Sequence, residues 1–337
     1  EGLATILKQF HARVLPELDR IIDLFPEYTP HNSLHIGNLV ELKQLILEPV
    51  VLPKLSRLEL FILDAAILSH DWGMAIARDE QLNVIKRQDD GLTEGPCLIR
   101  QFLVDLGWKE SDLSKLAEVE HRSNWAEYIR RTHHLRSGQR IRQWFGPSNQ
   151  DLGEAIALVA EGHGLEFREL ENESMFQVEK SVQGENVNIQ ALAIYLRLID
   201  LLDICKNRTP YEMWRFIKPK NERSALEWRK HAALRQPIRL KNPPNWLKIE
   251  AEPVDAETLG ELHDLREWCL EEFDRGNHLL KRGSPSEYHY DLERIEFLIR
   301  PRNGLHSVPV RFTFDHLRTL ELLGEEVYGH DPYVFLR

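Results

Sequence analysis

Residues 60–74 read Leu-Phe-Ile-Leu-Asp-Ala-Ala-Ile-Leu-Ser-His-Asp-Trp-Gly-Met, and this stretch decides the fold. Its first ten residues are apolar on almost every side of a helix, which is typical of a helix at the centre of a bundle. His70 and Asp71 follow at the inner end, where an unpaired carboxylate costs several kcal/mol of folding free energy. A divalent cation removes that cost, because it attracts the carboxylate and accepts the lone pair of a neutral imidazole. The stretch therefore predicts a helical bundle built around a metal site.

On both sides of this stretch, apolar residues recur at spacings of three and four, which predicts further helices. Pro26 and Pro30 break the chain after the first of them. Polar, irregular segments at residues 86–95 and 166–188 are expected to be loops. The predicted helices cover residues 3–25, 34–47, 58–75, 96–106, 113–145, 152–162 and 189–205.

After Pro210 the pattern changes from long helices to shorter segments, several of which read as strands. The sequence therefore predicts a mainly α fold with a helical domain over residues 1–210 and a smaller α+β extension over 211–305. A final strand and helix are expected within residues 306–337. The elements predicted after Pro210 are strands at 237–240, 246–251, 295–300 and 308–314 and helices at 259–280 and 317–323.

The composition limits the kinds of partner that the chain can bind. Among 337 residues, 54 Asp and Glu outnumber 43 Lys and Arg, which gives a formal net charge of -11. This excess argues against a surface that binds nucleic acid or an anionic membrane throughout, although a local basic cleft is compatible with it. The cysteines are 3 in number and far apart, which excludes a disulfide framework and favours a cytoplasmic location. No run of about 18 apolar residues occurs, so no membrane span is expected.

Histidine is unusually frequent, with 15 residues, and several histidines stand near aspartates. Asp200 poses the same burial problem as Asp71, because it lies in the apolar segment Leu-Arg-Leu-Ile-Asp-Leu-Leu-Asp. These residues fit a His/Asp metal centre, and the alternative is a buried polar network without a metal. Mixed imidazole and carboxylate ligands suit Mn, Fe, Co, Ni or Zn, and Mg where fewer histidines take part. The candidate residues are His31, His35, His70, Asp71, His133, His134, His163, Asp200 and Asp203.

The order His…His-Asp…His…His…Asp, carried on helices, resembles the HD superfamily of metal-dependent phosphohydrolases. The resemblance implies an HD-type helical bundle with two sets of metal ligands that share Asp71, which bridges two ions and orients the nucleophilic water. The first set is His35, His70, Asp71 and Asp200, and the second adds His163 with either His133 or His134. Only one of that adjacent pair is expected to point inward, because neighbours on a helix point about 100° apart. His31, in Pro-His-Asn-Ser-Leu-His, resembles the general acid of the cyclic-nucleotide phosphodiesterases.

A narrower resemblance is to the HD-CE branch, which consists of predicted effectors of bacterial conflict systems. The segments that carry it are His-Asp-Trp-Gly-Met, Arg-Thr-His-His-Leu-Arg-Ser, Glu-Gly-His-Gly and Glu-Trp-Arg-Lys-His. In that branch the domain is often fused to a GHKL-type ATPase related to the heat-shock chaperones. Residues 306–337, and most clearly 322–337, resemble the lead-in to such an ATPase, which implies an attached ATPase module. The resemblance to the HD-CE branch implies a role in antiviral defence.

The expected reaction is hydrolysis of a phosphate ester or phosphodiester of a nucleotide, because an acidic chain attracts a polymer of phosphates only weakly. Two alternatives stay open: a nuclease acting on single-stranded DNA or RNA, and a catalytically silent module that senses a nucleotide. A homo-oligomer is also compatible with the sequence. Asp203 is expected either to bind a ribose hydroxyl of the substrate or to orient a ligand histidine. The candidates for binding phosphate are Arg130, Arg131, Arg136, Arg197, Lys206 and Arg208.

Overall fold

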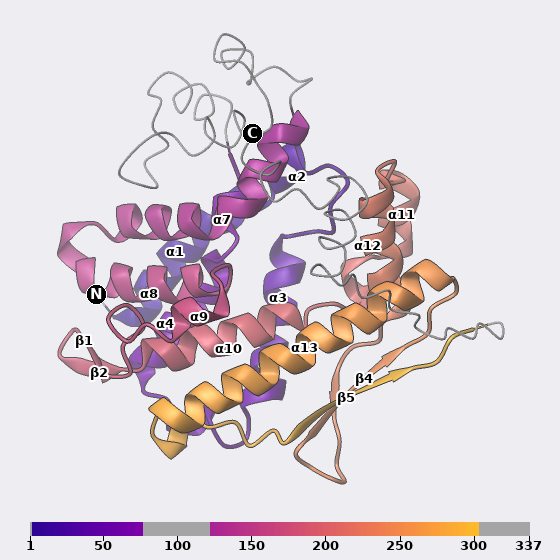
Figure 1. The fold of residues 1–337 in the computed structure, drawn as a ribbon. Coiled ribbons are helices and arrows are strands. Elements are labelled where there is room, and N and C mark those ends of the chain that lie inside the picture. Colours follow the sequence, from indigo (N-terminus) through magenta and orange to yellow (C-terminus); the bar gives the residue numbers. More distant parts are fainter. Residues whose placement is uncertain (1, 77–121, 303–337) are drawn as a thin grey trace, which may run out of the picture.

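The computed structural model describes residues 2–76 and 122–302 and is mainly helical, as the sequence predicts (Figure 1). Five short 3-10 turns lie between the longer elements of these two ranges, at Leu52–Lys54, Trp72–Met74, Pro147–Asn149, Lys206–Arg208 and Ser286–Tyr288. The helices are α1 (Leu3–Leu18), α2 (Ile21–Leu24), α3 (Ser33–Leu47), α4 (Arg57–Ser69), α7 (Arg122–Phe145), α8 (Gln150–Gly162), α9 (Phe167–Leu170), α10 (Ile189–Leu201), α11 (Tyr211–Ile217), α12 (Glu222–Ala233) and α13 (Ala256–Gly283).

Three apolar helices, α4, α8 and α10, form the centre of the molecule. α8 packs against α4, α7 and α10, and α1 packs against α4. In α10 every residue from Ile189 to Leu196 is buried, so this helix is enclosed on all sides. α13 contacts α10 and covers it in Figure 1, and apolar residues of both helices belong to one core. The core therefore runs without a break from the helical part into the C-terminal part.

The start and the end of α4 explain why the deciding stretch is a helix. Ser56 and Glu59 form a capping box, in which Ser56 Oγ accepts from Glu59 N (3.1 Å) and Glu59 Oε2 accepts from Ser56 N (2.9 Å). The helix ends at Ser69, and His70 is its C-cap. The prediction extended this helix to residue 75, but the chain turns earlier. That turn places His70 and Asp71 at the inner end of a buried helix, as expected.

α7 lies against the Trp72–Met74 turn with almost no space between the two backbones. Ser137 Oγ accepts a hydrogen bond from Gly73 N (2.7 Å) and donates one to His70 O (2.5 Å). A Cβ atom on Gly73 would lie 2.6 Å from Ser137 N and closer still to His133 O. Glycine is therefore required at this position, because it lets the end of α4 approach α7 closely.

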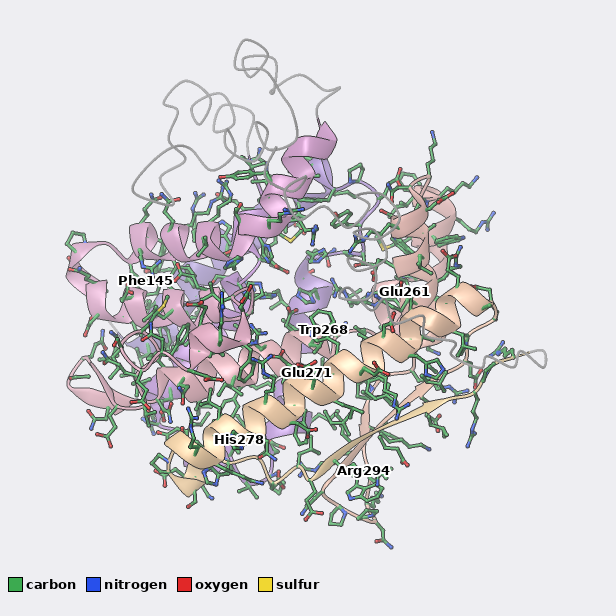
Figure 2. The ribbon with its side chains drawn as sticks, viewed as in Figure 1. Phe145, Glu261, Trp268, Glu271, His278 and Arg294 are labelled. Carbon is green, nitrogen blue, oxygen red and sulfur yellow. The ribbon has the colours of Figure 1, made fainter. Side chains whose placement is uncertain are left out.

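A three-stranded sheet lies in the C-terminal part. Its strands at residues 238–239 and 246–251 run antiparallel, and its strands at 246–251 and 294–299 run parallel. The long helix α13 is therefore the crossover between the two parallel strands. Figure 2 shows Glu261, Trp268, Glu271 and His278 along α13, whose other side is buried. A separate two-stranded hairpin lies within residues 166–188, where the sequence predicts only a loop. The strands of the sheet are β3 (Ile238–Arg239), β4 (Trp246–Ala251) and β5 (Arg294–Ile299), and those of the hairpin are β1 (Lys180–Val182) and β2 (Glu185–Val187).

Two helices, α11 and α12, lie in a stretch for which the sequence predicts no helix. The buried side chains of α12 are Ser224, Trp228 and His231, so its inward face is partly polar and shows no hydrophobic repeat. The segments predicted at 86–95, 96–106, 308–314 and 317–323, and the ATPase lead-in, lie outside the described residues. Within the described ranges, no helix is both long enough and apolar enough to cross a membrane.

Candidate metal centre

Two groups of metal-ligating side chains meet where α3, α4, α7, α8 and α10 converge. In each group, the ligand atoms lie within 4.8 Å of one another. Asp71 belongs to both groups, and it stands directly between the end of α4 and the Trp72–Met74 turn. The first group is His35, His70 and Asp71, and the second is Asp71, His133 and His163.

One oxygen of Asp71 faces the first group. Asp71 Oδ2 lies 3.5 Å from His35 Nε2 and 3.2 Å from His70 Nε2. Asp200 Oδ1, from the last turn of α10, lies 3.6 and 3.5 Å from the same two nitrogens. The two nitrogens are 3.2 Å apart. The structure thus brings together the four residues that the resemblance implies as ligands of the first metal.

The other oxygen of Asp71 faces the second group. Asp71 Oδ1 lies 3.5 Å from His133 Nε2, on α7, and 3.9 Å from His163 Nε2, at the end of α8. These two nitrogens are 2.9 Å apart. Each oxygen of one carboxylate therefore serves a different group, which is how a carboxylate bridges two metal ions.

The protonation of the histidines fits this interpretation. Three of them donate Nδ1–H to the backbone carbonyl three residues earlier: His70 at 2.9 Å, His133 at 2.8 Å, and His163. These acceptors assign the lone pair of each neutral imidazole to Nε2, the atom that points into the site. Lone pairs that face one another at hydrogen-bond distance repel unless a proton or a metal cation lies between them. The donor set therefore fits a metal ion.

His35 is held by a carboxylate in place of a carbonyl. Its Nδ1 donates to Asp203 Oδ2 (2.5 Å), and Asn38 Nδ2 donates to Asp203 Oδ1 (2.9 Å). A carboxylate in this position fixes the tautomer of a ligand histidine and raises its basicity. The side chain of Asp203 is 0% exposed, so it offers no surface to a ribose hydroxyl. Of the two predicted roles of Asp203, the geometry supports the orientation of a ligand and not the binding of substrate.

The charges at the site favour a cation. Burial acts against a charged His70, yet Asp71 and Asp200 raise the pKa of this imidazole well above its ordinary value. Burial also acts against charged carboxylates, yet His70 and its neighbours hold the pKa of Asp71 and of Asp200 below the ordinary value. Two carboxylates that stay ionised, Asp71 buried and Asp200 partly buried, attract positive charge to the point where the nitrogens converge. A divalent ion supplies that charge.

His133, and not His134, faces Asp71. His134 is buried under Gly164, where a Cβ atom would lie 2.5 Å from His134 Nδ1. Burial, together with the neighbouring His133, lowers the pKa of His134 to about 3 and keeps this ring neutral. The structure therefore does not support His134 as a ligand, because the helix turns its ring away from the site and into a packing contact.

His31 lies at the edge of the site, outside both ligand groups. Its ring centre is 5.6 Å from that of His35, and its Nδ1 has no hydrogen-bond partner among the described residues. Burial, followed by the nearby charge of Arg208, lowers the pKa of His31 to about 3. The imidazole is therefore neutral at pH 7 and keeps an unused nitrogen close to the ligands.

Three of the predicted phosphate-binding arginines are held by the protein itself. Arg136 is buried and donates from Nε to the backbone of the Trp72–Met74 turn at 3.1 Å. Arg197 pairs with Glu272 (2.5 Å) and donates to carbonyls at the end of α8. Arg208 donates to two carbonyls, at 3.1 and 3.0 Å. These contacts position the helices that carry the ligands, and they do not support a role in binding substrate.

The remaining basic candidates differ in position. Arg130 is half-buried and Arg131 is exposed, both on α7 near His133. Lys206 is exposed and lines a separate cavity. The sequence did not identify Asn38, which donates to Asp203, or Ser137, which bonds to the backbone of His70 and Gly73. Each lies three or four residues after a ligand histidine, and a polar residue at that helical spacing is the signal that identifies such positions.

Comparison with known families agrees with this geometry. The HD-CE family model matches residues 25–276, which is more than half of the chain and includes every ligand of both groups. The match also runs past residue 210, the predicted end of the helical domain, through α12 and into α13. No curated protein and no solved structure matches the chain.

Proposed function

Because the chain belongs to the HD-CE family, we propose that it is a metal-dependent phosphohydrolase that cleaves a phosphate ester or phosphodiester of a nucleotide. One observation carries the proposal: the two oxygens of Asp71 face two separate histidine groups. A carboxylate in this position is suited to hydrolysis, because it would hold two metal ions close together, and such ions would supply an activated water and neutralise charge on phosphorus-bound oxygens.

The residues of the site then divide into three roles. The first ion would be held by His35, His70, Asp71 and Asp200, and a second by Asp71, His133 and His163. When bound, such ions lower the pKa of water and neutralise charge on phosphoryl oxygens. Asp71 orients the attacking water, and Asp203 keeps the imidazole of His35 in the required tautomer.

His31 is suited to protonate the leaving oxygen, because its imidazole lies beside that of His35 and outside both ligand groups. A phosphate anion next to this ring raises its pKa, since a negative charge favours the imidazolium form. Arg130 and Arg131 lie on the same helix as His133 and within three residues of it, which makes them candidates for contact with the substrate.

The resemblance of the sequence to conflict effectors supports two further parts of this proposal. The hydrolase acts in a bacterial defence system, and a GHKL-type ATPase module attached after residue 306 regulates it. Both parts rest on the sequence resemblance and the family, and the described residues do not bear on them.

The test combines metal analysis with an activity screen. We expect the purified chain to contain Mn, Fe, Co, Ni, Zn or Mg and, with added Mn²⁺, to release phosphate or nucleoside from a nucleoside triphosphate or a cyclic nucleotide. In the His70→Ala/Asp71→Ala variant, both metal and activity should fall to background. His278→Ala/Asp274→Ala makes the same two changes on the exposed face of α13 and should retain both.

Other outcomes would overturn the proposal in identifiable ways. Cleavage of single-stranded DNA or RNA without hydrolysis of nucleotides would assign the nuclease alternative. Nucleotide binding without turnover in the metal-loaded chain would assign the silent sensor. Full activity in the His70→Ala/Asp71→Ala variant would place the chemistry elsewhere.

A further inference from the structure

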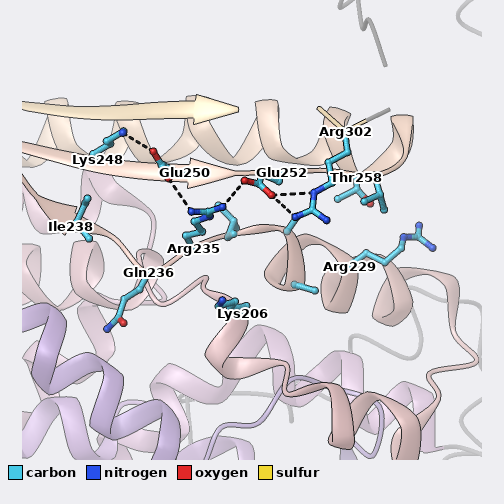
Figure 3. Close-up of a pocket in the computed structure, with 14 residues that line it drawn as sticks. Lys206, Arg229, Arg235, Gln236, Ile238, Lys248, Glu250, Glu252, Thr258 and Arg302 are labelled. Atoms are coloured by element: carbon cyan, nitrogen blue, oxygen red, sulfur yellow. Dashed lines mark hydrogen bonds and ion pairs between the residues drawn. The ribbon is translucent and has the colours of Figure 1, made fainter. Parts of the chain in front are cut away.

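A cavity of about 610 Å³ lies between the end of α12 and β4, and the residues that line it differ from those of the two ligand groups (Figure 3). This volume is in the range of small-molecule sites, about 300–1,000 Å³. On β4, buried residues alternate with less buried ones, and Leu247 and Ile249 face the core. Lys248 and Glu250 therefore point to the opposite side of the sheet, into the cavity.

The described lining of this cavity carries more positive than negative charge, although the whole chain has a net charge of -11. Glu252 is shared by Arg235 (2.6 Å) and Arg302 (2.5 Å). Glu250 is shared by Lys248 (2.5 Å) and Arg235 (3.6 Å). Three cations thus share two carboxylates, in the row that Figure 3 shows, and Lys206 adds a further charge. Arg229 contributes less, because it pairs outward with Asp255 and Glu257.

The cations are accessible, and apolar side chains stand beside them. The side chains of Arg235 and Arg302 are 55% and 62% exposed. Ile238 and Val254, which also line the cavity, are 50% and 56% exposed, which is high for branched apolar residues. A ligand that suits this lining carries several negative charges and an apolar group next to them.

The cavity shares a structural element with the metal centre. Lys206 begins the Lys206–Arg208 turn, and its backbone N donates to Leu234 O in the wall of the cavity (3.1 Å). At the other end of this turn, Arg208 donates to the carbonyl of Asp203 (3.1 Å), the residue that holds His35. A ligand at Lys206 therefore lies on the same short turn as Arg208, which contacts the residue that orients a metal ligand.

We propose that this cavity is a second nucleotide site, separate from the hydrolytic centre. Lys206, Arg235 and Arg302 contact the polyphosphate, as cations commonly bind phosphate oxygens. Ile238 and Val254 lie at opposite ends of the row of cations, and one of them contacts the base or the sugar. The site requires no metal ligand of the hydrolytic centre, so it does not depend on the proposed reaction.

The test is a calorimetric titration of the full chain with ATP, in EDTA so that the nucleotide is not hydrolysed. We expect ATP to bind, and inorganic triphosphate to bind more weakly because it lacks the apolar group. The Lys206→Glu/Arg302→Glu variant should weaken ATP binding at least tenfold, whereas Lys8→Glu/Lys54→Glu, with the same change in net charge at exposed positions, should not.

The metal-ligand variant separates this site from the hydrolytic centre. His70→Ala/Asp71→Ala should bind ATP in EDTA as the unmodified chain does. Loss of binding in that variant, unchanged binding in Lys206→Glu/Arg302→Glu, or no binding by the unmodified chain would each overturn the proposal. Thermal unfolding followed by circular dichroism checks that the charge-reversal variant is folded, and the single Lys206→Ala variant repeats the test with a smaller change.

Discussion

Asp203 contributes to the metal centre through one hydrogen bond to His35, and this contribution can be measured. In Asp203→Asn the side chain keeps its size but loses the negative charge that makes the imidazole a strong donor. Loss of such a partner typically weakens metal binding about 10–100-fold. We expect this loss when the metal-free chain is titrated with Mn²⁺ by calorimetry. Asp274→Asn, at an exposed position on α13, should bind as the unmodified chain does, and equal affinity of both variants would contradict the role of Asp203.

For individual residues, the sequence predicts the set of side chains that could bind a metal better than it predicts which members of that set face the site. His70 and Asp71 are predictable, because they follow an apolar helix and need a partner there. The choice between His133 and His134 depends on how α7 is rotated, and that rotation is set by the contact with Gly73. The role of Arg197 depends on Glu272, which lies far along the chain. Contacts of this kind follow from the fold and not from the local pattern.

At the scale of elements, Gly73 determines how closely α7 approaches the end of α4. Gly73→Ala would place a Cβ atom against the backbone of His133 and Ser137, which can relieve the clash only by moving the helix. We expect a loss of about 1–3 kcal/mol in the free energy of unfolding, measured by urea denaturation. Gly37→Ala is the matched control, because its Cβ atom would meet nothing within 4 Å. In α3 the alanine should stabilise the helix by about 0.5–1 kcal/mol, and equal stability of the two variants would contradict this account.

The elements that the sequence predicts well carry several apolar residues on their inward face, even where polar residues stand among them, as His35 and Asn38 do in α3. α3, α8 and α10 begin within two residues of their predicted starts. α10 ends at Leu201, before the predicted end at residue 205, because the chain turns to bring Asp203 to His35. α12 is not predicted, since His231 and Ser224 take inward positions that a hydrophobic repeat would fill with apolar residues. A helix with a single buried apolar residue, Trp228, therefore shows no hydrophobic repeat from which it could be predicted.

For the molecule as a whole, the change of pattern at Pro210 does not mark a gap in the core. Tyr195 donates to the carbonyl of Tyr288, and Asn188 Nδ2 donates to Ser284 Oγ (2.9 Å). Both contacts join α10 to the part of the chain after residue 210. The sequence shows that α10 is apolar all round, but the helix that covers its outer face lies some 70 residues later and shares no local pattern with it. The sequence of a buried helix therefore does not show which later helix packs against it.

This continuity predicts how fragments of the chain behave. A fragment of residues 2–210 would expose the side of α10 that α13 covers and would leave the guanidinium of Arg197 without Glu272. Removing one partner of a buried ion pair costs about 3–5 kcal/mol of folding free energy. The lost apolar contacts between α10 and α13 add to this cost. We expect the fragment 2–302 to unfold in one cooperative thermal transition by circular dichroism and 2–210 to show none. A cooperative transition and Mn²⁺ binding by 2–210 would instead establish the helical part as an independent domain, with the α+β extension as an attachment to it.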